Sequence, residues 1–227
     1  MKKNTMMRLA AVMLMCVLLT TSVVGGTFAK YVTSETGTDS ARVAKWGVTI
    51  QANGTTFAKQ YNDDPDTAGT QVVSDVKVVA PGTKGTMAKM ELSGTPEVKV
   101  RVTYDATLDL VGWNLYGGEE YCPIIITVGA TTYGLNSIYA SDASVVEKCA
   151  DITELKSKVV GAIAAYNAVY AANQDLSAAA VKTPYVSWQW PYENGNDSAD
   201  TYLGNQAAIG NAPTITLTII TTVEQVD

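Results

Sequence analysis

The sequence holds one set of carboxylates that could act together on a sugar. Glu119 and Glu120 are adjacent, and Glu193 follows the aromatic segment that contains Trp188 and Trp190. Hydrolysis of a glycosidic bond needs two carboxyl groups that flank the scissile bond. Two indoles on one strand could also stack on a sugar without catalysing any reaction. The simpler interpretation is that Trp188 and Trp190 pack in the core or on a strand face.

The chain contains no histidine, which removes most of the usual enzyme chemistries. Ser/His/Asp and Cys/His nucleophilic sites need an imidazole base. The zinc helix HExxH and the other His-ligated metal sites need imidazole ligands. The sequence also has no G-x-S-x-G motif, P-loop or dinucleotide fingerprint. We therefore predict that the protein is not an enzyme and has no catalytic residues.

Two acidic loops offer oxygen atoms that could bind calcium, the only cofactor the sequence suggests. Calcium takes several oxygen ligands around a turn, and neither loop has the spacing of an EF-hand. Solvated surface loops are the simpler interpretation, and Asp197 and Asp200 are the leading metal candidates. The ligand sets would be Asn62, Asp63, Asp64 and Asp66 in one loop and Asn194, Asn196, Asp197 and Asp200 in the other.

Two of the three cysteines, Cys122 and Cys149, follow the N-terminal signal that contains Cys16. Paired cysteines in an exported chain favour a disulfide. Closing this loop of about 27 residues would stabilise the fold by about 3.5 kcal/mol in the chain-entropy model. Two buried thiols are the alternative, and the sequence leaves both open.

Alternating hydrophobic and polar residues predict a mainly β fold that would position these groups. Residues 97–104 place three valines and a tyrosine on one face, which is typical of a half-buried strand. We predict a single jelly-roll-like antiparallel β-sandwich over residues 45–227. The expected strands are 45–51 with 55–61 across an Asn53-Gly54 turn, 71–80 with 86–92 across Pro81-Gly82, 97–104, 121–128 with Pro123 near its start, 184–193 and 213–226. Residues 194–210 are predicted to be a loop from their Gly, Asn and Asp content.

A helical insertion at about residues 142–175 interrupts the β pattern. Asp151 and Glu154 have the spacing of a capping box at its start. Apolar residues follow at spacings of three and four and form one stripe, which predicts a helix of about five turns packed on the sandwich. The stripe consists of Ile152, Leu155, Val159, Ile163, Tyr166 and Tyr170.

Residues 1–29 have the organisation of a cleaved export signal. Three basic residues precede the apolar run 9–19, which is too short for a comfortable membrane span. Thr27 and Ala29 occupy the −3 and −1 positions of a cleavage site, so the mature chain is predicted to begin at Lys30. An uncleaved membrane anchor is the alternative.

The mature chain is acidic. The signal holds three of the 16 basic residues and none of the 22 acidic ones, so its removal leaves a net charge of −9. Such a chain without a basic run is a poor ligand for nucleic acid and is repelled by anionic lipid. We predict an exported protein, secreted or held at the cell surface, that does not bind nucleic acid.

Four segments in the first half of the chain, which together cover roughly a third of it by the span they mark out, carry a resemblance to a known family. They are Gly25–Val32 (GGTFAKYV), Ala41–Ile50 (ARVAKWGVTI), Val79–Gly85 (VAPGTKG) and Val98–Tyr104 (VKVRVTY). Together they resemble the start of the TasA/camelysin family. These are secreted Gram-positive proteins, processed by a dedicated signal peptidase of the SipW type, that build biofilm matrix fibres. The helical insertion and the Trp-rich segment depart from that family.

The resemblance implies a structural role for the polar segment 30–44. In TasA-like fibres the freed N-terminal segment adds a strand to a neighbouring subunit, which places donor residues at Tyr31, Val32, Ala41 and Val43. The implied partners are other copies of this chain, an accessory matrix protein and the signal peptidase. The alternative function is an adhesin or carbohydrate-binding module using the tryptophans. A third is a camelysin-like metallopeptidase, for which the chain offers no recognisable zinc ligands.

Overall fold

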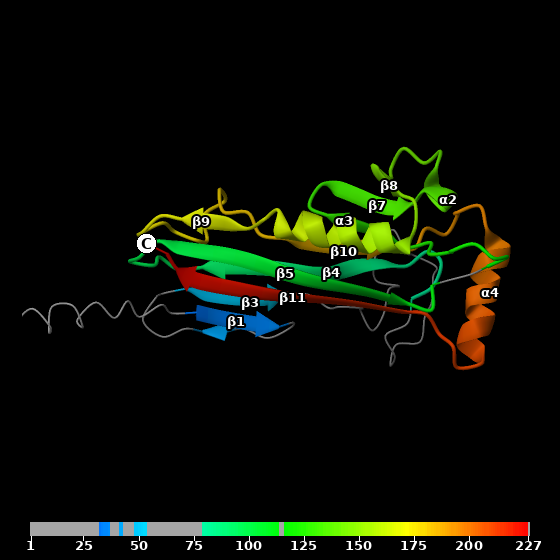
Figure 1. Cartoon of the computed structure of the whole chain (residues 1–227), viewed down its shortest axis with the longest axis horizontal. Coiled ribbons are helices and arrows are strands. Elements are labelled where there is room, and N and C mark those ends of the chain that lie inside the picture. Colours follow the sequence, from blue (N-terminus) through cyan, green and yellow to red (C-terminus); the bar gives the residue numbers. More distant parts are fainter. Residues whose placement is uncertain (1–31, 37–40, 43–47, 54–78, 114–115, 227) are drawn as a thin grey trace, which may run out of the picture. The chain divides into compact units, whose positions relative to one another are not determined.

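The computed structural model describes residues 32–36, 41–42, 48–53, 79–113 and 116–226, with side chains for residues 48–52, 79–113 and 116–226. All belong to one compact unit, Val32–Asp227. The unit is mainly β, as predicted. Its strands form two sheets, a four-stranded sheet in the order β1-β11-β5-β9 and a seven-stranded sheet in the order β2-β3-β4-β10-β6-β7-β8 (Figure 1).

Among the described residues, every strand pairing is antiparallel except the one between β7 and β8. The strands of the first sheet are β1 (Val32–Thr36), β5 (Val100–Val111), β9 (Ala168–Tyr170) and β11 (Thr214–Gln225). Those of the second are β2 (Ala41–Arg42), β3 (Thr49–Asn53), β4 (Lys84–Ser93), β6 (Ile125–Val128), β7 (Thr131–Leu135), β8 (Glu147–Cys149) and β10 (Tyr185–Gln189). The helices are α2 (Asn136–Tyr139), α3 (Ile152–Ala164) and α4 (Asp197–Ala208).

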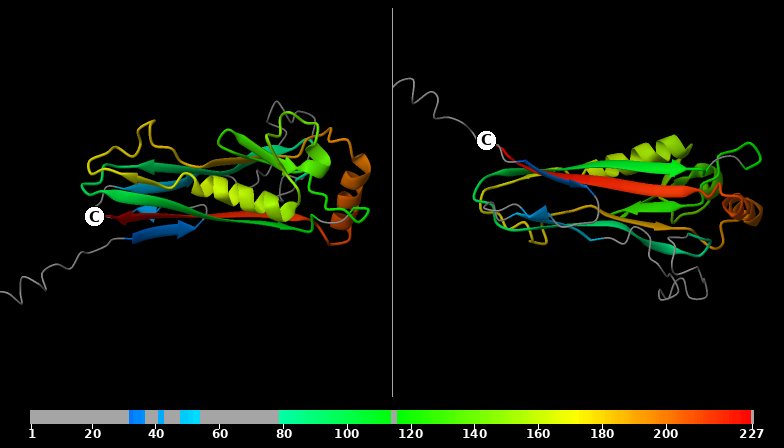
Figure 2. Two further views of the ribbon diagram at one scale, coloured as in Figure 1. Left: turned by 45° about the horizontal axis from the view of Figure 1, so that its top comes forward. Right: turned by 90° about the horizontal axis from the view of Figure 1, so that it is seen from below.

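The core lies between the two sheets, which face each other in Figure 2. Alternate residues of β5 and β11 point inward and bury apolar side chains against β4, β6 and β10. The inward face of β11 follows the predicted period of two, because Ile215, Ile219 and Val223 are buried while Thr214 and Thr216 are exposed. Pairing of β5 with β11 runs without interruption from Val111 opposite Thr214 to Val100 opposite Gln225.

The predicted helix begins as expected and ends early. The Asp151 side chain accepts a hydrogen bond from the Glu154 N–H at 2.7 Å, so the predicted cap is present. The predicted length of about five turns is wrong, because α3 ends at Ala164 after 13 residues. Beyond it the Asn167 side-chain oxygen accepts from the Tyr104 N–H at 2.7 Å, and the chain turns to form β9 along β5.

A further helix, α4, replaces most of the predicted loop at residues 194–210. Asn196 caps α4 by accepting a hydrogen bond from the Ala199 N–H. The side chains of Ala199 and Leu203 form the buried face of this helix. The loop predicted from composition was wrong, because two buried apolar side chains and one Asn cap are enough to hold a helix against the end of a sheet.

The other predicted strands fall near β3, β4, β5, β6, β10 and β11, and Pro123 lies just before β6. The turn at Pro81-Gly82 is present, with Gly82 at φ 85° and the Thr83 N–H bonded to the Ala80 carbonyl. The predicted segments 55–61 and 71–78 lie outside the described residues. Within the described part of the chain, no helix is long and apolar enough to cross a membrane.

Candidate functional site

The N-terminal arm contributes a strand to the edge of the first sheet. β1 pairs antiparallel with β11, from Val32 opposite Glu224 to Thr36 opposite Ile220, and the two strands lie side by side in Figures 1 and 2. β1 therefore occupies the outer edge of this sheet. Of the predicted donor residues, Val32 lies in β1 and Ala41 in β2. Tyr31, Val43 and the cleavage residues Thr27, Ala29 and Lys30 lie outside the described residues.

The same arm also reaches the edge of the second sheet. Ala41 lies opposite Ile50 and Arg42 opposite Thr49, so β2 extends the sheet beyond β3. A single short segment of chain thus pairs with an edge strand of each sheet. Backbone hydrogen bonds to an edge strand do not depend on sequence, so the same pairings can be made by another copy of the arm.

The β11 edge is only partly covered. β1 pairs with residues 220–224, which leaves 214–219 with no partner strand on that side among the described residues. Residues 201–223 contain no Asp, Glu, Lys or Arg. Soluble proteins usually protect a free edge with charged side chains, Pro or bulges. The β11 edge lacks the charges, so it remains suited to accept another strand.

The opposite edge of this sheet is protected. β9 pairs with Val100–Val102 of β5, and α3 packs along β5 and against β6 and β7. Leu155, Val159 and Ile163 of α3 are fully buried in the shared core. A helix over a strand edge is a common way to prevent further pairing. The β11 side of this sheet is therefore more open to strand pairing than the β9 side.

The two tryptophans do not form an exposed platform. Trp188 is 2% and Trp190 is 5% exposed, so both indoles pack in the core, which was the simpler interpretation of the sequence, and not on a surface where they could stack on a sugar. They point the same way, as predicted, but into the core: the Trp188 ring lies against Gly85, and Trp190 makes an edge-to-face contact with Trp113 at 5.5 Å. Packing of this kind contributes to stability and leaves no ring face for a ligand.

The carboxylates singled out in the sequence have structural partners or lie apart. The Glu120 carboxylate accepts a hydrogen bond from the Ile152 N–H at the start of α3. Asp200 accepts from the Tyr121 hydroxyl and the Asn194 amide, and Asp197 lies in the first turn of α4. Acidic groups in a first turn stabilise the helix dipole. Among the described residues, no group of three or more His, Cys, Asp or Glu could hold a metal ion.

Cys122 and Cys149 are free thiols in the structure, and both are fully buried. Of the two alternatives left by the sequence, the structure has the thiols and not the disulfide. Burial raises the pKa of Cys122 to about 12 and raises that of Cys149 as well. Both groups therefore stay protonated at neutral pH and pack as small apolar side chains.

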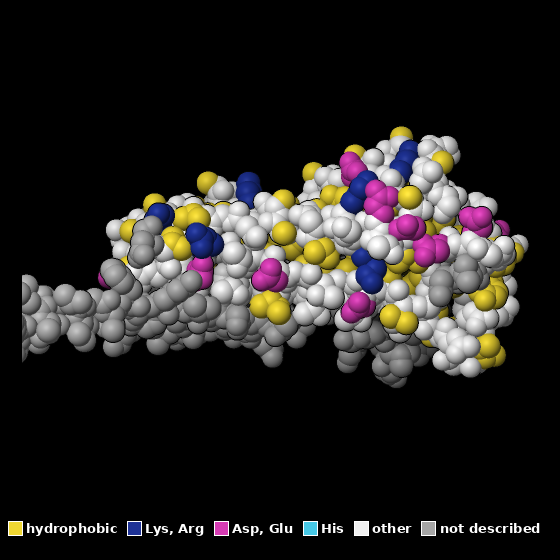
Figure 3. Space-filling view, viewed as in Figure 1, with side chains coloured by type: hydrophobic (Ala, Val, Ile, Leu, Met, Phe, Trp, Pro, Cys, Tyr) yellow, Lys and Arg dark blue, Asp and Glu magenta, His cyan; other side chains and the backbone are white. Residues whose placement is uncertain are grey.

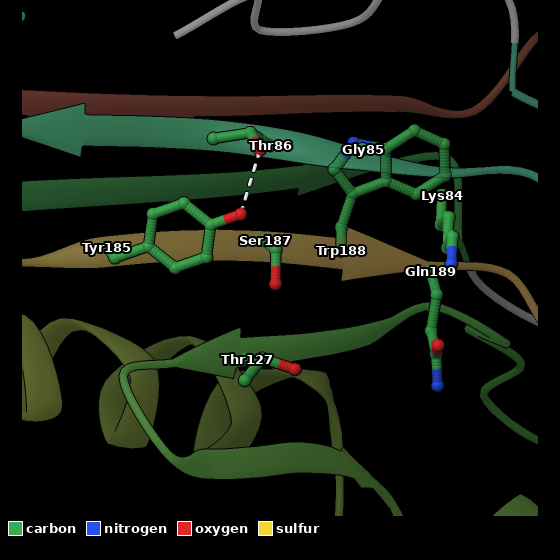
Figure 4. Close-up of a pocket in the computed structure, with 8 residues that line it drawn as sticks. All are labelled: Lys84, Gly85, Thr86, Thr127, Tyr185, Ser187, Trp188 and Gln189. Carbon is green, nitrogen blue, oxygen red and sulfur yellow. Dashed lines mark hydrogen bonds between the residues drawn. The ribbon is translucent and has the colours of Figure 1, made fainter. Parts of the chain in front are cut away.

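A polar hollow of about 320 Å³ lies on the second sheet, over β4, β10 and β6 (Figure 4). Thr127, Ser187 and Thr86 lie opposite one another on the three strands. The Tyr185 hydroxyl is 3.0 Å from that of Thr86, and its side chain is 41% exposed. Lys84 and Gln189 complete the polar lining. No local sequence pattern points to this hollow, because its residues come from separate strands and meet only through the strand order.

The described residues define a mainly β protein with two sheets and a peripheral N-terminal strand. No protein-family model, curated protein or solved structure matches the chain.

Proposed function

We propose that this protein is a secreted structural protein, the subunit of an extracellular or biofilm matrix fibre that assembles by donor-strand exchange. The observation that supports the proposal most directly is the pairing of β1 with the edge of β11, which carries no charged residue from Thr214 to Val223. The resemblance of residues 25–32 and 41–50 to the TasA/camelysin family supports the same role. In this proposal the two sheets form a jelly-roll-like sandwich, and a SipW-type peptidase frees the arm at Lys30.

The physical route is replacement of one arm by another. In a free subunit β1 pairs with its own β11, and in a fibre β1 of one subunit pairs with β11 of the next. The same backbone hydrogen bonds form in both states, so little free energy separates them locally. A contact in which a segment of one copy enters a different surface of the next is heterologous, and it propagates into a filament instead of closing.

The first test is electron microscopy of the mature protein that begins at Lys30, beside a variant that lacks residues 30–44. Filaments from the first sample and monodisperse particles from the second are the expected result. Monodisperse particles in both, over a range of salt and calcium concentrations, would show that the chain does not assemble by itself.

A disulfide trap distinguishes pairing of β1 with β11 of a neighbouring subunit from pairing of β1 with β11 of its own subunit. Ser34 lies directly opposite Thr222, and facing residues on paired strands are close enough for a disulfide. Ser34→Cys with Thr222→Cys should give a ladder of covalent multimers from oxidised filaments. Cross-linked monomers alone would show that the arm stays on its own subunit. Ser34→Cys with Thr216→Cys is the matched control, since Thr216 lies six residues further along the same face of β11.

The polar hollow supports a second candidate function, an adhesin or carbohydrate-binding module. Its row of hydroxyls, the Gln189 amide and the exposed Tyr185 ring are groups that hydrogen-bond and stack on sugars. Calorimetric titration with soluble oligosaccharides tests it. Tyr185→Ala should abolish binding, whereas Tyr192→Ala, at a tyrosine that is 68% exposed and outside the hollow, should not. Equal binding of oligosaccharide by both variants would exclude the hollow as the sugar-binding site. The peptidase activity described for camelysin is not proposed, because the chain has no histidine.

A further inference from the structure

A buried hydroxyl group lies in the part of β11 that pairs with β1. Thr221 is 0% exposed and faces the core between two apolar residues of the same strand face, Ile219 and Val223. It lies opposite Tyr104 on β5 and opposite Glu35 on β1. Thr221 therefore occupies the middle strand, with the body of the domain on one side and the N-terminal arm on the other.

This hydroxyl has lost water without gaining another hydrogen bond. Among the described residues, neither the Thr221 hydroxyl nor the Tyr104 hydroxyl has a hydrogen-bond partner, so these two groups do not satisfy each other. A buried hydroxyl without a partner raises the free energy of the state that buries it. That cost lasts for as long as Thr221 is kept from water.

The neighbouring stretch of β11 indicates that β1 helps to keep water out. Residues 214–219 have no partner strand on the β1 side among the described residues. Leu217, in the middle of that stretch, also packs against the core but is only half-buried. Release of β1 would turn residues 220–224 into an edge of the same kind. Water would then reach the Thr221 hydroxyl and remove the cost of its burial.

Threonines on the outer face of the same strand carry no such cost. Thr216 is exposed, and Thr218 and Thr222 are half-buried. Figure 3 shows this face of the sheet, where uncharged polar surface predominates around a few charged side chains. Hydroxyl groups on it can bond to water whether or not β1 is in place. Of the two threonines that pair with β1, Thr221 is therefore the one whose hydrogen bonding changes when the arm leaves.

From this contrast, and resting on the proposed donor-strand function, we infer that the unpaired Thr221 hydroxyl makes β1 easier to release and so raises the rate of strand exchange. In the closed monomer and in the filament a β1 strand covers β11, so the cost of the buried hydroxyl is the same in both. It is relieved only in the intermediate whose β11 edge is open. The hydroxyl thus lowers the barrier to exchange without favouring either end state.

The test is amide hydrogen exchange in the mature protein, kept monomeric by dilution. In wild type the protected amides of β1 should exchange faster than those of β5, which marks local release of the strand. Thr221→Val should slow the exchange of the β1 amides at least about fivefold, because the closed state no longer contains an unpaired hydroxyl. Thr222→Val is the matched control, with the same change at the next residue, opposite Ser34. It should exchange like wild type.

Assembly kinetics give the second measurement. By light scattering, Thr221→Val should form filaments about fivefold more slowly than wild type. The final mass of filament should be unchanged, because the substitution acts equally on the closed monomer and on the filament. Thr222→Val should match wild type in both rate and mass.

The outcomes separate this inference from the function on which it rests. Wild-type β1 amides that exchange no faster than those of β5, or equal β1 exchange in Thr221→Val and wild type, would overturn it and leave the fibre function standing if filaments form. Equal slowing by the two valine variants would also overturn it, because the effect would then be one of strand propensity. Slower β1 exchange in Thr221→Val with no filaments from wild type would support the effect of Thr221 on arm release and overturn the fibre function.

Discussion

Thr83 and Thr221 are buried threonines with opposite hydrogen-bonding states. The Thr83 hydroxyl donates to the Ala80 carbonyl at 2.6 Å and accepts from the Ala80 N–H at 3.1 Å. The Thr221 hydroxyl has no hydrogen-bond partner among the described residues, and neither does that of Tyr104, which lies opposite it on β5. An unpaired buried hydroxyl destabilises a fold, whereas a paired one does not.

Replacement of each threonine by valine should therefore change stability in opposite directions. Thr221→Val removes an unsatisfied hydroxyl at nearly constant volume and should raise the free energy of unfolding by about 1 kcal/mol. Thr83→Val leaves the Ala80 N–H unpaired and should lower it by about 1–3 kcal/mol. Chemical denaturation of both variants measures the two effects. A loss of stability in Thr221→Val would mean that its hydroxyl finds a partner in solution.

The two thiols make a prediction about reactivity. The thiolate is the reactive form, and burial keeps the pKa of Cys122 at about 12 and raises that of Cys149. Neither should react with iodoacetamide at pH 8 in the folded mature protein, and both should react after unfolding in guanidinium without a reductant. Mass spectrometry counts the adducts. Absence of adducts until a reductant is added would reveal the disulfide instead.

At the scale of the element, α3 begins with charge-assisted contacts that depend on pH. Glu154 accepts a hydrogen bond from the Ala150 N–H at 2.6 Å and pairs with Lys158 at 3.2 Å. These contacts, the backbone hydrogen bond first, lower the pKa of Glu154 below its ordinary value of 4.5. A lowered folded-state pKa means that the ionised group stabilises the fold above about pH 4.5 and that this contribution is lost as the pH falls through the folded pKa.

Glu154→Gln should accordingly lower the melting temperature at pH 7 and have little effect at pH 3. Glu193→Gln, at an exposed glutamate before α4, is the matched control and should change neither. Differential scanning calorimetry at both pH values gives the comparison. An equal decrease at pH 3 would assign the effect to the shape of the side chain and not to its charge.

The elements differ in how far the sequence predicts them, and the reason is where their stabilising contacts lie. β11 and the start of α3 were predictable, because alternation and a capping box are local signals. β8 and β9 have three residues each, and their pairing depends on strands distant in sequence. α4 rests on Ala199 and Leu203, too few apolar residues to show a period. The β11 edge was not predictable, because strand order is not encoded in any single segment.

At the scale of the whole molecule, the strand edges of the two-sheet domain are covered by a packed helix on one side and by short strands of the N-terminal arm on the other. α3 covers β5 with fully buried side chains, whereas the arm meets β11 and β3 through short strands. Buried side chains from Val48 to Val223 form a core within the body of the domain. A protein that lacks residues 30–44 retains this core and should fold with a vacant β11 edge.

That vacancy predicts complementation by a free peptide. A labelled peptide of residues 30–44 should bind the arm-deleted protein by adding a strand along β11, with fluorescence anisotropy as the readout. A peptide with Thr33→Pro and Ser34→Pro should not bind, because consecutive prolines remove the N–H group that faces β11 whichever of the two residues donates it. The full mature protein, whose own arm occupies the edge, should bind the first peptide much more weakly. Equal binding of both peptides would show that side chains outside the β ladder, and not strand addition, hold the arm.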